Sequence, residues 1–177
     1  RKADMSNTRT LSSFGCTPIN SADFRKVALD KHLMYSKLIN EDLGNLGIPR
    51  TKKYSDSELI PFLRESQTCI VKPRFGSGGN GIIKISKVGN LYEINSKGSL
   101  TRCSEAELVG RLSHIRKKLG LSKRLFIIQD CIDLPKYNDS VFDVRVIYQR
   151  GAKGSPLRTG MAVRIAAPNR VAANLHQ

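Results

Sequence analysis

The amino-acid sequence predicts a mixed α+β fold made of two small subdomains. Three observations support this prediction. Apolar residues recur at helical spacing behind capping residues in the first two thirds of the chain. A glycine-rich run separates two segments that favour extended backbone, and the last third alternates apolar and polar residues as antiparallel strands do.

Three helices are expected, each behind a capping residue. They run from Lys31 to about Asn40 behind Asp30, from the Ser55-x-x-Glu58 capping box through Leu63, and from the Ser104-x-x-Glu107 box to Gly120. Pro61 leaves a later start open for the second helix, because proline is best tolerated in a first turn. Residues 1–20 are polar and turn-rich, so we expect irregular structure there.

The segment from Ile70 to Ile85 predicts a strand, a glycine-rich turn and a second strand. Pro73 keeps Lys72 out of the helical region, and four glycines follow within six residues, Gly76 to Gly81. Because the lysine precedes the glycines and no helix follows them, the segment is neither a Walker A loop nor a dinucleotide fingerprint. It indicates a flap that holds phosphate groups, with an ordinary β-hairpin as the alternative.

The remaining elements are expected to be strands. They lie around Arg50–Tyr54 and at Thr68–Lys72, Gly81–Ser86, Leu91–Ile94, Leu125–Gln129, Phe142–Tyr148, Met161–Ala166 and Val171–Leu175. The last three form an antiparallel meander. We therefore expect a lead-in or remnant of a preceding domain over 1–29, an N-terminal subdomain over 30–128, and the first part of a C-terminal subdomain over 129–177.

Composition narrows the classes of partner and the compartment. The net charge of +15 is spread along the 177 residues, which suits a polyanionic ligand, a nucleic acid or a solvated exterior. The four cysteines are scattered without a Cys-x-x-Cys pair, so we expect no zinc site and a reducing compartment. No apolar run approaches the roughly 18 residues of a membrane span, and no signal peptide is visible, so the expected location is cytoplasmic.

The order of these motifs resembles the ATP-grasp superfamily. Five features carry the resemblance: Asp30-Lys31 before a helix, Gly47-Ile48-Pro49, Val71-Lys72-Pro73 with the glycine run, the strand ending in Gln129, and Phe142-Asp143-Val144-Arg145-Val146. The phrases Gln-x-x-Ile-Asp-Leu and Phe-Asp-x-Arg-Val are most similar to the endospore coat-associated ATP-grasp proteins, with the ribosomal-protein glutamate ligases second. The resemblance covers Asp30 to Gln177.

The resemblance implies a nucleotide site. Lys31 and Lys72 would reach the phosphates, and Ser77, Gly78, Gly79 and Gly81 would belong to the flap that folds over them. Gln129 would read the adenine amino group. The backbone of Asp130, Cys131 and Ile132 would line the adenine edge, with Asp133 near the ribose.

The resemblance also implies a reaction. Arg145 and Arg164 would lie near the γ-phosphate or an acyl phosphate, with Asn174 beside them. The implied activity is an ATP-dependent carboxylate–amine ligase, with Mg²⁺ ligands expected downstream of Gln177, so this chain alone is expected to be inactive. Its partners would be ATP and small-molecule or peptide carboxylates and amines. Two alternatives remain: a non-catalytic relative with a structural or spore-coat-type role, and a basic nucleic-acid-binding domain.

Overall fold

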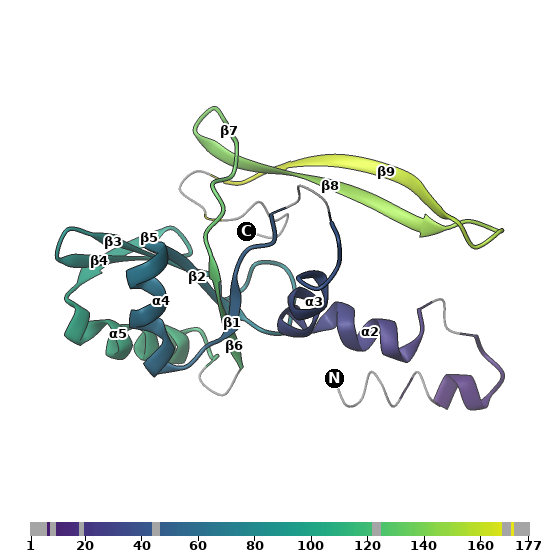
Figure 1. The fold of residues 1–177 in the computed structure, drawn as a ribbon, viewed down its shortest axis with the longest axis horizontal. Coiled ribbons are helices and arrows are strands. Elements are labelled where there is room, and N and C mark those ends of the chain that lie inside the picture. Colours follow the sequence, from purple (N-terminus) through teal and green to yellow (C-terminus); the bar gives the residue numbers. More distant parts are fainter. Residues whose placement is uncertain are drawn as a thin grey trace.

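A computed structural model describes residues 7, 10–17, 20–43, 47–121, 125–167 and 171. It shows the mixed α+β architecture expected from the sequence, with two antiparallel sheets and helices beside the larger one (Figure 1). The chain crosses from the larger sheet to the smaller one through 131–135. No helix in the described part of the chain is both long and apolar enough to cross a membrane.

The larger sheet has six antiparallel strands in the order β1–β6–β2–β3–β4–β5. Their bounds are β1 Thr51–Lys53, β2 Thr68–Pro73, β3 Ile83–Val88, β4 Leu91–Ser96, β5 Ser99–Cys103 and β6 Phe126–Asp130. The strand–glycine turn–strand prediction is confirmed, because β2 pairs with β3 in antiparallel register from Thr68–Ser86 to Val71–Ile83. The sequence prediction missed β5, a short strand with four exposed residues out of five.

Helices α4 (Asp56–Ser66) and α5 (Glu105–Lys118) cover one face of this sheet. Alternate residues of β2 and β3 point into the core, where they meet the apolar faces of both helices. The core-facing side chains are Leu59, Phe62, Leu63, Cys69, Val71, Ile83, Ile85, Tyr92, Ile94, Cys103, Leu108, Leu112, Phe126 and Ile128. The opposite face therefore carries the other alternate residues of these strands.

Local capping fixes where the two covering helices begin. The Ser55 hydroxyl accepts a hydrogen bond from the Glu58 N–H at 3.2 Å, and the Glu107 carboxylate accepts one from the Ser104 N–H at 3.0 Å. Helix α4 starts at Asp56, directly after its cap, with Pro61 inside it. The alternative of a later start was therefore wrong, because the cap and the buried apolar face outweigh the proline.

Two further helices precede the sheet. They are α2 (Ala22–Leu29) and α3 (Lys31–Leu38), which meet at Asp30. The expectation of irregular structure over 1–20 was wrong for residues 10–13, which are helical. Helix α3 contacts β1 and ends two residues before the expected Asn40.

The smaller sheet has the order β7–β8–β9, with β7 Lys136–Tyr137, β8 Ser140–Arg150 and β9 Pro156–Ile165. Strands β8 and β9 form a long hairpin that arches past α3 (Figure 1), with a register shift at Ile147/Tyr148. The predicted alternation holds, because Val144, Val146, Met161 and Val163 share one exposed face of the hairpin. Of the strand expected at Val171–Leu175, only Val171 lies among the described residues.

Candidate functional site

The face of the larger sheet opposite α4 and α5 carries a transverse row of five residues, all of them polar except Ile70. Strand pairing places Thr51 opposite Gln129, Gln129 opposite Ile70, Ile70 opposite Lys84, and Lys84 opposite Asn95. Residues in register on adjacent strands share one face, so the side chains of this row lie together. Lys72 lies two residues beyond Ile70 on the same face.

Lys72 is half-buried and held by two neighbours. Its Nζ donates a hydrogen bond to Gln129 Oε1 at 2.6 Å and lies 5.5 Å from the centre of the Tyr35 ring. Burial, together with the positive charge of Lys31, lowers the pKa of Lys72 to about 8. The protein therefore holds an ammonium group where its charge is poorly solvated, a situation that a bound anion would relieve.

Lys31 is placed by a tie between the start of α3 and the chain after β2. Asp30 accepts two hydrogen bonds from Arg74, at 2.8 Å from Nε and 2.7 Å from Nη2, and the Lys31 N–H donates to the Arg74 carbonyl at 3.0 Å. Burial would raise the pKa of Asp30, but hydrogen bonds from Arg74 and the Leu33 N–H outweigh it and leave that pKa lowered. Lys31 Nζ in turn donates to the Gly76 carbonyl at 2.6 Å.

The glycine turn between β2 and β3 thus lies beside both lysines. Four glycines of the turn have positive φ values, between +74° and +107°, which residues other than glycine rarely adopt. They are Gly76, Gly78, Gly79 and Gly81. Gly81 is also enclosed, since a Cβ there would clash with Leu121 Cδ1 and lie 2.9 Å from Pro73 Cγ. Ser77 is exposed at the turn. The turn is therefore specified by its backbone, and it exposes Gly76, Ser77 and Asn80.

The connection after β6 lines a hollow of about 320 Å³ with the open face of the sheet. Cys131, Ile132 and Asp133 from the connection meet Lys84 and Asn95 from the sheet there. Burial raises the pKa of the Cys131 thiol. The hollow has the mixed apolar and polar lining of a small-molecule site.

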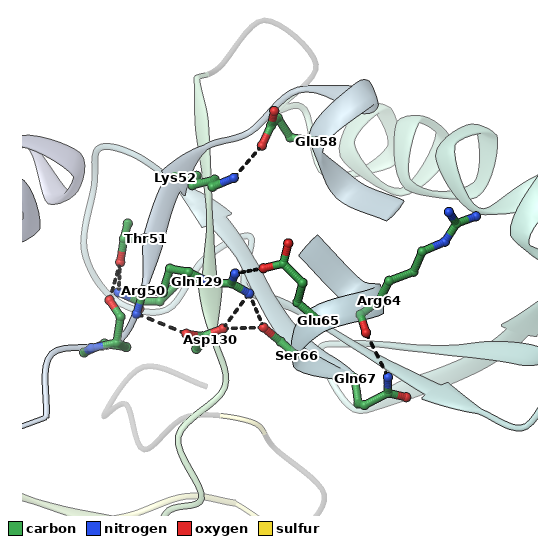
Figure 2. Close-up of polar contacts among 11 residues, drawn as sticks. Arg50, Thr51, Lys52, Glu58, Arg64, Glu65, Ser66, Gln67, Gln129 and Asp130 are labelled. Atoms are coloured by element: carbon green, nitrogen blue, oxygen red, sulfur yellow. Dashed lines mark hydrogen bonds and ion pairs between the residues drawn. The ribbon is translucent and has the colours of Figure 1, made fainter. Parts of the chain in front are cut away.

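Asp130 turns its side chain to the other side of the strand, toward α4 (Figure 2). Its carboxylate accepts hydrogen bonds from the Arg50 N–H at 3.1 Å and from Ser66 Oγ at 2.6 Å, and the Arg50 guanidinium lies 3.5 Å away. The same guanidinium bonds Ser66 and Glu65 and stacks over the Phe62 ring at 4.1 Å. Asp130 thereby anchors the end of β6, from which the connection starts.

The two candidate arginines lie on the β8–β9 hairpin. Arg164 faces Asp143 across the hairpin and makes two hydrogen bonds with its carboxylate, one from Nε at 2.6 Å. This pairing raises the pKa of Arg164, although burial opposes it. Arg145 is exposed, two residues along β8 from Asp143. Asn174 lies outside the described residues.

Comparisons with known proteins identify the family. The family model described as YheC/D-like ATP-grasp matches residues 20–177. The chain belongs to this family. It is 26% identical over 150 residues to the endospore coat-associated protein YheC of Bacillus subtilis, which covers 82% of the chain and 40% of YheC. It is also 49% identical over 57 residues to MJ0776 of Methanocaldococcus jannaschii, described as uncharacterized, which covers 32% of the chain and 14% of that protein. The chain thus spans less than half the length of either relative.

The sequence prediction of the site missed Lys84 and Asn95. Lys84 stands between Ile83 and Ile85, an alternation that places it on the face opposite the core, but the sequence does not show which strands are neighbours. Pairing of β3 with both β2 and β4 is what brings these two residues to the hollow.

Proposed function

We propose that this ATP-grasp chain forms the ATP-binding part of an ATP-dependent carboxylate–amine ligase. The observation that carries the proposal is that Lys31, Lys72 and the glycine turn lie together, and that Lys72 shares the open face of the sheet with Lys84 and Asn95. Lys84 and Asn95 line a hollow together with the Cys131–Asp133 connection. Two ammonium groups beside a glycine turn that exposes Gly76 and Ser77 match a chain of phosphates, and the hollow on the same face of the sheet as Lys72 matches a nucleoside.

The residues of the chain would act by positioning and by offsetting charge. Lys31 and Lys72 would neutralise phosphate oxygens, and the turn at Ser77, Gly78, Gly79 and Gly81 would close over them. The backbone of Asp130, Cys131 and Ile132 would border the base, with Asp133 near the ribose. Transfer of the terminal phosphoryl group of ATP to a carboxylate gives ADP and an acyl phosphate. An amine attacks the acyl carbon, forms the amide and loses a proton as inorganic phosphate leaves. We propose Arg145, Arg164 and Asn174 as the groups near that intermediate.

Magnesium is the metal that such chemistry commonly uses, and it is typically held by one or two carboxylates together with phosphates of the substrate. Within the described ranges, no three His, Cys, Asp or Glu side chains lie together. Asp143 is already paired with Arg164. We propose that metal ligands are supplied by sequence downstream of Gln177. The turnover of the chain alone is expected to be nil, and its location is proposed to be cytoplasmic.

A second function has one specific observation in its favour. The Bacillus subtilis relative is named for its association with the endospore coat. A structural role that uses the same fold without catalysis would leave nucleotide binding intact or vestigial, and would give no ATP hydrolysis with any carboxylate and amine.

The thiol in the hollow provides a test of where ATP binds. Cys131 is half-buried, Cys16 is exposed, and Cys69 and Cys103 are buried. In a Cys16→Ser variant, we expect iodoacetamide to modify mainly Cys131, and ATP to slow that reaction in proportion to occupancy. The Lys72→Met variant is the matched control, in which ATP should lose this protection. Alkylation of Cys131 at the same rate with saturating ATP would place the nucleotide elsewhere and refute the proposal.

A further inference from the structure

We propose that Gln129 is a positioning residue that holds the amine of Lys72, as the last member of a polarised hydrogen-bond relay from Pro49 through Thr51. The inference rests on the proposed nucleotide site and assigns a residue of that site a role different from contact with the base. Three strands contribute to the relay: β1 supplies Thr51, β6 supplies Gln129, and β2 supplies Lys72.

The direction of the relay is fixed at its start. The Pro49 carbonyl oxygen can only accept a hydrogen bond, and it accepts one from the Thr51 hydroxyl at 2.9 Å. The only hydroxyl hydrogen of Thr51 is used in that bond, so Thr51 Oγ1 can act toward Gln129 only as an acceptor. It accepts a hydrogen bond from Gln129 Nε2 at 2.6 Å. The amide nitrogen of Gln129 must therefore face Thr51, and the amide oxygen must face Lys72, which donates to it at 2.6 Å. Donor and acceptor chemistry alone excludes the flipped amide.

Both ends of the Gln129 amide are thus engaged by the protein. The side chain is 5% exposed, so it has little room to turn toward a ligand. Reading the amino group of adenine would need a lone pair of the Gln129 carbonyl oxygen that a ligand can reach. Lys72 uses one lone pair, and burial keeps the other away from a ligand. The relay instead fixes the Lys72 amine between the Gln129 oxygen and the Tyr35 ring, so that it stays aimed along the open face.

Holding the amine in place has a clear benefit for a phosphate site. A lysine side chain loses considerable conformational entropy when it is ordered on a ligand. A lysine already fixed by Gln129 would bind phosphate with less of that loss. The gain in affinity should therefore apply to any polyphosphate, whatever base is attached to it.

The experiment compares three probes on four proteins. ATP, GTP and inorganic tripolyphosphate are titrated by calorimetry into the wild type and into Gln129→Met, Thr51→Val and Thr51→Ser. We expect Gln129→Met to weaken all three probes by a similar factor, about tenfold, the size expected for a hydrogen bond to a charged group. Thr51→Val should weaken the binding of all three probes by a smaller factor. Thr51→Ser, which keeps the hydroxyl, should bind them as tightly as the wild type.

A loss confined to ATP, with GTP and tripolyphosphate unaffected, would overturn the inference and make Gln129 a base reader. Failure of the wild type to bind any probe would instead overturn the proposed function. In that event the relay is tested by the pH profile of Lys72 acetylation with acetic anhydride. Gln129→Met and Thr51→Val should lower the pKa of Lys72 further and Thr51→Ser should not, because a hydrogen-bond acceptor favours the charged amine. An unchanged profile in both of the first two variants refutes the relay.

Discussion

Lys72 should make the stability of the protein depend on pH between about 8 and 10.5. Burial and Lys31 lower its pKa from the usual 10.5 to about 8, so within this interval the unfolded chain binds more protons than the folded one. The free energy of unfolding must therefore rise with pH through the interval. The charged lysine destabilises the fold below pH 8, and this cost disappears above pH 10.5.

The size of the effect follows from the same two values. Each pKa unit corresponds to about 1.4 kcal/mol, so the wild type should gain about 2 to 3 kcal/mol relative to Lys72→Met between pH 7.5 and pH 10.5. Urea unfolding of both proteins across this range gives the difference directly and removes the contribution of other titrating groups. Lys72→Arg is the control. Because arginine stays charged in this range, the difference in unfolding free energy between Lys72→Arg and Lys72→Met should not change with pH.

A constant difference between wild type and Lys72→Met would refute the reasoning, since it would mean that Lys72 is solvated as in the unfolded chain. Bound polyphosphate should raise the pKa of Lys72 back toward its usual value, because negative charge favours the protonated amine. Calorimetry at pH 8.5 in buffers of different ionisation enthalpy should therefore show proton uptake on ATP binding by the wild type and less by Lys72→Arg.

Two further substitutions, each with a matched control variant, test the surroundings of the site. Asp130→Ala should lower the free energy of unfolding by about 2 to 3 kcal/mol, because it removes the acceptor of the Arg50 N–H and the Ser66 hydroxyl; Glu65→Ala, at a 61% exposed side chain in the same network, should cost less than about 1 kcal/mol in the same urea titration. Gly81→Ala should cost about 1 to 3 kcal/mol and weaken ATP binding, because its Cβ would clash with Leu121 and lie 2.9 Å from Cγ of the Pro73 ring, at a φ of +81°. Gly78→Ala, at a φ of +74° with its nearest neighbour 4.0 Å away, should show the backbone strain without the clash and cost less. Equal losses in the two glycine variants would contradict the packing argument.

The elements that the sequence predicts well are those specified by local chemistry. Ser55 and Ser104 mark the starts of α4 and α5, and the alternation around Lys72 and Lys84 marks which residues of β2 and β3 face away from the core. The short strand β5 was missed because its residues are mostly exposed and it owes its conformation to pairing with β4.

The sequence by itself determined the fold class and the strand that carries Lys72 into the glycine turn, because these depend on propensities and motif order within short stretches. The tertiary structure decided which strands are neighbours: β6, late in the chain, inserts between β1 and β2. That insertion brings Gln129 between Thr51 and Lys72, and the pairing of β3 with β4 brings Lys84 beside Asn95. Contacts between residues as far apart as 57 and 78 positions leave no local pattern, since they arise from burial of the whole sheet against α4 and α5.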